Sequence, residues 1–275
     1  MSQIYADLHT HSCFSDGQTT PEELLLRAGF AGLSIIALTD HDTVDGLQPL
    51  VAAASGETPQ VVPGVELSCT EGKQEIHLLG YWIDPDEKNL RSELQRIRQA
   101  RVTRAERIVD RLRDHQIVLD FDEVMGLTRN GLVGRPHIAE AMVRGGHVPD
   151  HHTAFRLYLG DGKRAAVPKE FLTPAEGIGL IRRAGGWVSV AHPAVTKPDA
   201  LLPRLKIEGL GGLEVWHPKH TTREIEQCLA TSRSLDLVPT GGSDYHGLEA
   251  GATILGHYGL TEERYQHVLL AAGRA

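Results

Sequence analysis

Short apolar runs alternate with helical segments in the first third of the chain. Runs of this kind are typical of strands, and four are predicted, over residues 4–8, 34–38, 60–67 and 76–83. Thr20 and Glu23 form a capping box around Pro21, which predicts the start of a helix. A shorter helix is predicted over residues 46–54. Strand followed by helix is the pattern of α/β proteins.

The same alternation returns after residue 170. Thr173 and Glu176 form a second capping box, and two glycines, Gly185 and Gly186, end that helix. The remaining elements are predicted as strands over 187–191, 212–216 and 237–240, and as helices over 199–207, 221–235 and 261–272. Repeated strand-then-helix units favour a parallel sheet, either open or closed into a barrel.

Residues 84–169 follow a helical period instead. Leu90, Leu94, Ile97 and Ile108 fall on one stripe of a long helix, and residues 88–113 carry nine Lys and Arg against three acidic residues. Shorter helices are predicted after it. We therefore predict a domain formed by residues 1–83 and 170–275, interrupted by a helical insertion over 84–169.

Composition excludes several classes of protein. The 275 residues include 28 Lys and Arg against 36 Asp and Glu, and this acidic balance excludes a basic protein that coats nucleic acid. No apolar run reaches the ~18 residues of a membrane helix, and the N-terminus has neither a basic leader nor a long apolar segment. The 3 cysteines lack CxxC spacing, so a cytoplasmic protein is expected. Histidine is abundant, with 15 residues.

Potential metal ligands recur where the predicted strands end. Side chains two residues apart in a strand point the same way, so His9 and His11 can converge on one ion, and Asp244 and His246 repeat this spacing. In (β/α) barrels the chemistry gathers at the carboxyl ends of the strands. The other candidates follow the same rule, with Glu66 expected at the end of its strand: Asp16, His41, Glu66, His77 and His192. A polynuclear metal site is predicted; the alternative is a set of buried polar pairs and surface histidines.

Several ordered motifs resemble the polymerase and histidinol phosphatase (PHP) superfamily. They are Asp7–Ser12 (DLHTHS), Leu38–Asp42 (LTDHD), the strand of Glu66, Ala191–Pro193 (AHP) and Gly241–His246 (GGSDYH). The resemblance covers the chain outside the insertion. It implies an α/β fold, a distorted (β/α)7 barrel with the helical insertion as a subdomain, that binds up to three divalent ions.

The resemblance also implies three groups of metal ligands. The first ion would be held by His9, His11, Glu66 and Asp244, the second by Asp16, His41 and His192, and the third by Glu66, His77 and His246. Imidazole and carboxylate ligands suit manganese, zinc or iron, with manganese expected first. His41, His192 and Asp244 are expected to be catalytic as well.

Such a site would hydrolyse phosphoesters. Three divalent ions outweigh the charge of the carboxylates that hold them, and a focused positive charge attracts phosphate even to an acidic protein. Closely spaced ions also acidify a bridging water. Hydrolysis by a metal-bound hydroxide is therefore predicted.

Other residues are candidates for binding the substrate. Arg101 and Arg104 lie on the apolar stripe of the long helix, where they either meet phosphate or pair with acids. Arg135 stands at a predicted helix start, and His217 follows the sixth predicted strand. The full set of candidates is Arg101, Arg104, Arg135, His137, Lys163 and His217. Seven histidines, His220 among them, are expected at the surface.

The insertion resembles one branch of the superfamily, the bacterial nucleoside 3′,5′-bisphosphate phosphatases and related 5′–3′ exonucleases of short RNA. This implies removal of the 3′-phosphate from adenosine 3′,5′-bisphosphate, with the insertion covering the substrate cleft. The alternatives are 5′–3′ cleavage of short oligoribonucleotides, histidinol phosphate hydrolysis, and a non-catalytic binding barrel. Small nucleotides or short RNAs are the expected partners, without duplex nucleic acid or membrane; the oligomeric state stays open.

Overall fold

The chain divides into two compact units. The computed structural model describes residues 3–56, 58–128, 131–168, 172–247 and 255–275. One unit is formed by Met1–Ser92 together with Phe171–Ala275, and the other by Glu93–Glu170. The first boundary falls inside a helix, later than the change of pattern at residues 83–84, and the expected boundary at residues 169–170 lies outside the described residues.

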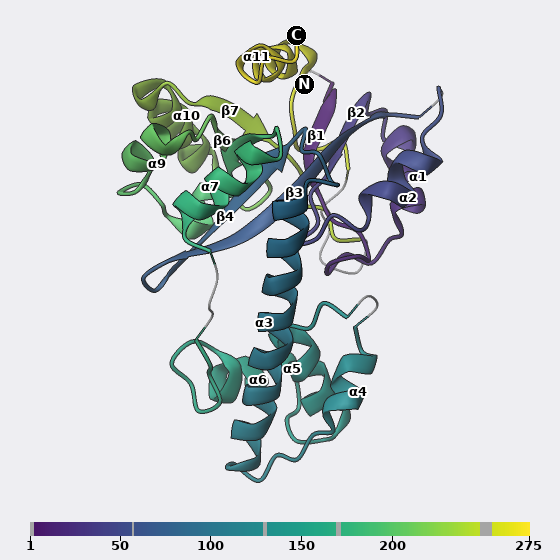
Figure 1. The fold of residues 1–275 in the computed structure, drawn as a ribbon, viewed down its shortest axis with the longest axis vertical. Coiled ribbons are helices and arrows are strands. Elements are labelled where there is room, and N and C mark those ends of the chain that lie inside the picture. Colours follow the sequence, from purple (N-terminus) through teal and green to yellow (C-terminus); the bar gives the residue numbers. More distant parts are fainter. Residues whose placement is uncertain (1–2, 57, 129–130, 169–171, 248–254) are drawn as a thin grey trace. The chain divides into compact units, whose positions relative to one another are not determined.

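Seven strands form one sheet in chain order (Figure 1). They are β1 (Ala6–Thr10), β2 (Ile35–Leu38), β3 (Gln60–Glu71), β4 (Gln74–Tyr81), β5 (Trp187–Val190), β6 (Gly212–Trp216) and β7 (Val238–Gly241). The two ends of the sheet meet beyond β7, where the Asp244 amide donates to the His9 carbonyl at 2.8 Å and the His11 amide donates to the Tyr245 carbonyl at 2.9 Å. The sheet is thus a nearly closed (β/α) barrel, as predicted.

The fourth strand departs from the expected parallel order. β4 is antiparallel to both β3 and β5, whereas the other neighbouring strands pair in parallel. β3 and β4 form a hairpin in which Glu71 pairs with Gln74 around a turn at Gly72 and Lys73, with Gly72 at a φ of 61°. β3 therefore runs beyond residue 67, and Glu66 lies inside the strand rather than at its end.

Helices cover the outside of the barrel (Figure 1). They are α1 (Pro21–Phe30), α2 (Leu47–Ala53), α7 (Pro174–Arg183), α8 (Pro193–Thr196), α9 (Leu202–Glu208), α10 (Thr222–Leu235) and α11 (Glu262–Ala271). The capping box predicted at Thr173 and Glu176 is present. At α1 only half of it forms, because Thr20 accepts from the Glu23 amide while the Glu23 carboxylate pairs with Arg27 instead.

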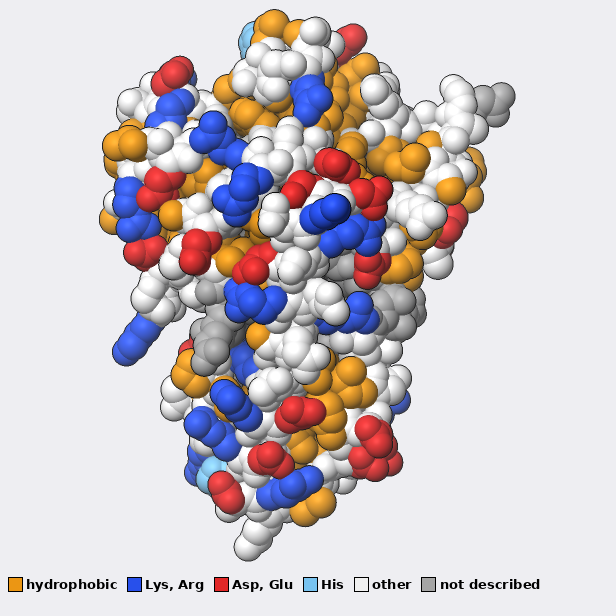
Figure 2. Space-filling view, viewed as in Figure 1, with side chains coloured by type: hydrophobic (Ala, Val, Ile, Leu, Met, Phe, Trp, Pro, Cys, Tyr) orange, Lys and Arg blue, Asp and Glu red, His pale blue; other side chains and the backbone are white. Residues whose placement is uncertain are grey.

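The second unit is helical, as predicted. It contains most of α3 (Lys88–Arg113), followed by α4 (Phe121–Gly126), α5 (Arg135–Arg144), α6 (His151–Ala154) and a π-helical turn, η1 (Phe155–Leu159). These helices enclose a core of their own, in which Ile108, Leu112, Ile138 and Met142 are buried. Figure 2 shows Lys and Arg side chains interspersed with Asp and Glu on the visible face. Among the described residues, no helix combines the length and the apolar character needed to cross a membrane.

Candidate metal centre

The nine predicted ligands all belong to the barrel unit, and Glu66 lies at their centre. Its side chain is fully buried. The Oε2 atom lies 2.9 Å from His9 Nε2, 3.1 Å from His11 Nε2 and 3.3 Å from His41 Nδ1. Asp244 Oδ1 lies 3.6 and 3.4 Å from the same nitrogens of His9 and His11. His9, His11, Glu66 and Asp244 therefore form one group, the same four that were expected around the first ion.

The other carboxylate oxygen of Glu66 faces two further imidazoles. Oε1 lies 2.7 Å from His77 Nδ1 and 3.1 Å from His192 Nε2. His77 and His192 come from adjacent strands, since the amide of Ala191, next to His192, donates to the carbonyl of His77. One buried carboxylate thus faces five imidazoles, three on one oxygen and two on the other.

Asp16 lies close to a second group of imidazoles, which shares His11 and His41 with the group around Glu66. His246 Nε2 lies 3.1 Å from Asp16 Oδ1, and His41 Nε2 lies 3.8 Å from Asp16 Oδ2. These residues and His11 form a second group whose ligand atoms all lie within 4.8 Å of one another. The pairing differs from the expectation, which placed His192 beside Asp16 and His246 beside His77. Barrel topology explains the exchange, because His246 follows the strand that closes onto β1, whereas His192 follows β5, the neighbour of β4.

The donor set fits metal ions better than it fits hydrogen bonds alone. His11 Nε2, His41 Nδ1 and His192 Nδ1 are buried and have no hydrogen-bond partner, although two of them lie within 3.3 Å of a Glu66 oxygen. Buried polar atoms are normally satisfied. Imidazole nitrogens and carboxylate oxygens that converge without hydrogen-bond geometry are what a divalent ion requires.

Charge coupling within the cluster is strong. Burial raises the pKa of the Glu66 carboxyl, but the surrounding imidazoles outweigh this effect and hold it well below its usual range. Burial lowers the pKa of His11 and of His77, yet the nearby carboxylates of Asp244 and Glu66 bring His11 to about 10, and Glu66 brings His77 to about 9. For His41, burial prevails and lowers the pKa to about 4. Without metal, protons on some imidazoles compensate the buried carboxylates.

The second carboxylate oxygen of Asp244, Oδ2, contacts two residues that follow β6. His217 Nε2 lies 3.3 Å from Asp244 Oδ2, and Lys219 Nζ lies 2.9 Å from the same oxygen. His217 is fully buried, and its Nδ1 accepts from the Lys219 amide. His217 was predicted to lie near the ligands, whereas Lys219 was not predicted. The prediction of His220 at the surface was wrong: the ring is buried and its Nδ1 lies 2.9 Å from the Val215 carbonyl.

Two further buried carboxylates support the cluster and were not singled out from the sequence. Asp40 accepts from the Ser12 amide at 2.7 Å and from the Ser15 hydroxyl at 2.6 Å, which fixes the loop that carries Asp16. Glu214 is fully buried in β6 and contacts His9. The sequence signal was present, since Glu214 is the one charged residue within the apolar run of β6.

Among the described residues, seven non-glycine residues have a positive φ, and three of them lie within or beside the ligand set. Asp42, His192 and Asp244 have φ angles of 50°, 30° and 51°, in the left-handed region that non-glycine residues rarely adopt. All three lie just after the ends of strands. Such strain persists where surrounding contacts impose it and is common at functional sites.

Three of the candidates expected to bind substrate in the insertion have hydrogen-bond partners within their own unit. Arg104 Nε donates to the Val167 carbonyl at 2.9 Å, and Arg101 is half-buried on the same helix. Arg135 donates to Asp161 at 2.7 Å and lies over the Phe155 ring. The last two are His137, whose Nδ1 accepts from the Gly134 amide, and Lys163, which is exposed.

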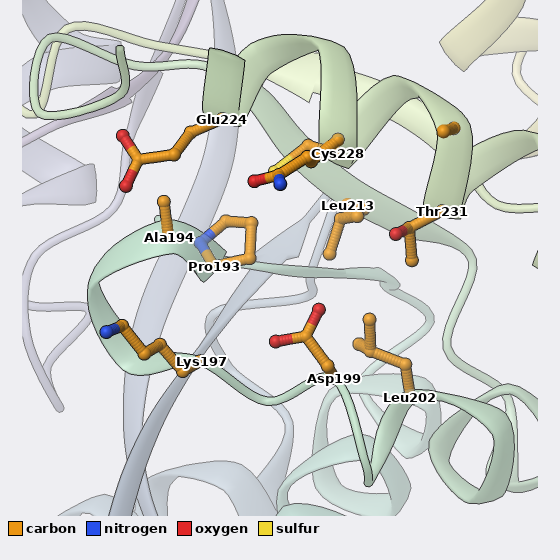
Figure 3. A pocket seen from close by; sticks show the side chains of 11 residues that line it. Pro193, Ala194, Lys197, Asp199, Leu202, Leu213, Glu224, Cys228 and Thr231 are labelled. Atoms are coloured by element: carbon orange, nitrogen blue, oxygen red, sulfur yellow. The ribbon is translucent and has the colours of Figure 1, made fainter.

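A cavity of about 610 Å³ opens on the outside of the barrel (Figure 3). Its walls come from α8, the following loop, β6 and α10, and include Pro193, Leu213 and Cys228. None of the nine ligands lines it. Pro193 nevertheless follows His192 directly, and Leu213 precedes Glu214, so this cavity and the ligand cluster lie on opposite sides of the same segments.

Comparison with known proteins agrees with this geometry. Residues 7–147 match the PHP domain. A 3′,5′-nucleoside bisphosphate phosphatase of Chromobacterium violaceum is 34% identical over 91% of this chain and 90% of its own. A 5′-3′ exoribonuclease of Haemophilus influenzae is 33% identical over 87% of this chain and 89% of its own.

A solved structure from Bifidobacterium adolescentis, described as a candidate metal-dependent phosphoesterase, is also similar. It superposes with a TM-score of 0.86 at 30% identity and covers 98% of both chains. The sequence match, the barrel and the histidine–carboxylate cluster lead to the same assignment: this chain belongs to the PHP domain family of metal-dependent phosphoesterases.

Proposed function

We propose that this protein removes the 3′-phosphate of nucleoside 3′,5′-bisphosphates, converting adenosine 3′,5′-bisphosphate to AMP and phosphate. The observation that carries the proposal is Glu66, whose two buried oxygens face five imidazoles at the barrel mouth. The named activity of the Chromobacterium relative, which aligns along 91% of this chain, supports the choice of substrate.

Three divalent ions, with manganese expected first, would be held by groups that share residues. The groups proposed from the geometry are His9, His11, Glu66 and Asp244; Glu66, His77 and His192; and Asp16, His41 and His246. When bound, such ions supply Lewis acidity and a water of lowered pKa for attack on phosphorus.

The chain's own residues bind phosphate and hold Asp244. The Nδ1 atom of His217 accepts a hydrogen bond, so its ring proton resides on Nε2, directed at Asp244. We assign His217 to orienting Asp244. The side chain of Lys219 is 60% exposed although its Nζ contacts the same carboxylate. We assign this ammonium group to binding the phosphate that is removed.

The second phosphate of the substrate is assigned to basic residues of the insertion. Guanidinium groups bind phosphate through paired hydrogen bonds. Arg104 lines a cavity of about 270 Å³ within this unit, together with Arg96, Thr103 and Arg107, which supports anion binding there. The proposed set is Arg101, Arg104, Arg135, His137 and Lys163. A cytoplasmic location is also proposed, supported by three cysteines that are all free.

The second candidate function is 5′–3′ cleavage of short RNA, favoured by the exoribonuclease relative. Both reactions break a bond at a 3′-oxygen beside a 5′-phosphorylated nucleoside. Steady-state kcat/KM with manganese, measured on adenosine 3′,5′-bisphosphate and on a 5′-phosphorylated trinucleotide, separates them. We expect the bisphosphate to be preferred; an equal or higher kcat/KM for the trinucleotide would contradict the proposal.

A further inference from the structure

Glu214 lies on the inward face of β6. Neighbouring side chains of a strand point to opposite faces. Accordingly, Leu213 lines the outer cavity in Figure 3, whereas Glu214 is fully buried on the side of the ligand cluster. A buried carboxylate is costly unless its oxygens are paired, so the partners of Glu214 indicate its role.

Both oxygens of Glu214 contact residues of the ligand cluster. Oε1 lies 3.0 Å from His9 Nδ1, and Oε2 accepts from the His192 amide at 2.7 Å. The same two histidines reach the two oxygens of Glu66 through their Nε2 atoms, at 2.9 and 3.1 Å. Glu214 therefore contacts both His9 and His192, which face different carboxylate oxygens of Glu66.

The contact with His9 determines which ring nitrogen carries the proton. An ionised carboxylate only accepts hydrogen bonds, so Nδ1 of His9 must carry a hydrogen. In the neutral ring Nε2 is then the lone-pair atom, and it is the nitrogen that faces Glu66 and Asp244. Carboxylates commonly orient metal-binding histidines in this way.

The contact with His192 acts on the main chain. His192 has φ 30° and ψ 59° and precedes a proline, a position for which extended backbone is preferred. Among the described residues, its Nδ1 has no hydrogen-bond partner. No hydrogen bond therefore holds the ring through the nitrogen that faces away from Glu66. The hydrogen bond from the His192 amide to Glu214 is a buried side-chain contact that holds this strained turn.

We propose that Glu214 is a positioning residue for the metal centre. It holds His9 in the Nδ1-protonated tautomer and His192 in its left-handed turn, so that both rings present Nε2 to Glu66. This role rests on the metal centre of the proposed function but not on the identity of the substrate.

An alternative role for Glu214 is direct coordination. His9, Glu214 and His217 also have ligand atoms within 4.8 Å of one another. However, an ion at this position would have to take His9 Nδ1 as its ligand, and that nitrogen would then carry no proton. The two roles therefore predict opposite protonation of one ring.

The first test uses the wild-type protein. Long-range proton–nitrogen NMR spectra of the zinc-loaded chain, labelled with ¹⁵N-histidine, report the state of each ring nitrogen, with His9 assigned from a His9→Gln spectrum. We expect His9 to be protonated on Nδ1 and metal-bound through Nε2. An unprotonated Nδ1 in the wild-type protein would overturn the proposal, whether or not any variant folds.

The second test is Glu214→Gln. An amide oxygen can accept from only one of the two N–H groups, so one contact is lost. We expect manganese binding, measured by EPR titration, to weaken ~10- to 100-fold, with kcat lowered more than KM is changed. Asp7→Asn is the matched control: Asp7 is equally buried, but its Oδ1 accepts only from the His9 and Ser243 amides, which an amide oxygen can still do.

The outcomes are distinct. Glu214→Gln with wild-type manganese affinity would overturn the positioning role while leaving the phosphatase proposal intact. Loss of one whole equivalent of manganese in this variant, together with an unprotonated His9 Nδ1 in the wild-type protein, would also overturn it, in favour of coordination. Weakened binding in both Glu214→Gln and Asp7→Asn would overturn a specific role of Glu214, because any buried change here would then disturb the site. A protein inactive on nucleotides, but with the expected tautomer and affinities, would contradict the proposed function alone.

Discussion

At the scale of single residues, the molecule is organised around one buried carboxylate. Glu66 is fully buried, where an isolated charge would be prohibitively costly. Five imidazoles stabilise it, and in the metal-free protein protons on His11 and His77 share that task. Removing a single partner from such a cluster leaves the others uncompensated.

Glu66→Gln tests this arrangement. Loss of the bridging charge should abolish high-affinity metal binding and lower kcat by about 10³-fold or more, since metal ions contribute several kcal/mol to catalysis. Metal analysis and phosphate release measure the two effects. Glu71→Gln, in the same strand but paired with Arg204 at the surface, should retain both. Normal metal content in Glu66→Gln would contradict the central position of this residue.

Arg135→Ala tests the proposed role of the insertion in substrate binding. If Arg135 binds the 5′-phosphate equally in ground and transition states, KM should rise with little change in kcat. Arg135 also pairs with Asp161, so Asp161→Asn, which removes that pair alone, is the control and should leave KM close to wild type. A fall in kcat without a change in KM would point to a role in the transition state instead.

The residues of the cluster were predictable to different degrees. His9 and His11 stand in an i, i+2 motif at the end of β1, and the period of the strand brings both rings to Glu66. The same spacing does not unite Asp244 and His246, because Asp244 has a left-handed backbone and the two residues belong to different groups. The distribution of His192 and His246 between groups was not predictable, since it depends on which strands are neighbours. Glu214 stands out as a charge within the apolar run of β6, but its partners His9 and His192 are distant in sequence, so no local pattern indicated its role.

At the scale of elements, closure of the barrel depends on close contact between β7 and β1. A Cβ atom on Gly242 would lie 2.4 Å from the backbone nitrogen of His9, a distance that backbone atoms cannot accommodate without moving. The carboxyl end of β7 therefore approaches the metal ligands only because residue 242 has no side chain.

Gly242→Ala should therefore destabilise the barrel by about 1–3 kcal/mol, the usual cost of overpacking. Urea unfolding measures this loss, and metal binding should weaken along with it. Gly126→Ala is the control, because a Cβ there meets nothing within 4 Å, and it should be neutral or slightly stabilising. Equal stability of the two variants would show that the β1–β7 contact is not tight.

The strands and most helices could be predicted because apolar runs and caps are local signals. The direction of β4 could not, since a buried parallel and a buried antiparallel strand have the same composition. The end of β3 was missed for a related reason. Ser68 and Thr70 interrupt the apolar run, but pairing with β4 extends the strand through them to Glu71.

At the scale of the whole molecule, metal binding, protonation and folding are coupled. Raised pKa values of about 10 for His11 and 9 for His77 mean that the metal-free fold binds these protons more tightly than the unfolded chain does. Their stabilising contribution is complete below the unfolded pKa of ~6.5 and is lost as the pH rises through about 9 and 10.

Two results should follow from this coupling. Manganese must displace these protons, so its apparent affinity should increase with pH up to about 10. Proton release on binding is measurable by calorimetry in buffers of different ionisation enthalpy. The metal-free protein should lose thermal stability as the pH rises from ~6.5 to about 10. Saturating manganese adds ~2.7 kcal/mol at 100 times Kd and should preserve the fold over the same range. Metal affinity independent of pH would contradict the coupling.

The central claim is that residues distant in the sequence meet at one end of the barrel to hold divalent ions. Anomalous diffraction at the manganese edge, from crystals of the full chain grown with manganese, tests it most directly. We predict strong peaks on both sides of Glu66, within coordination distance of His9, His192 and Asp244. Crystals with no anomalous peak among these side chains would contradict the account.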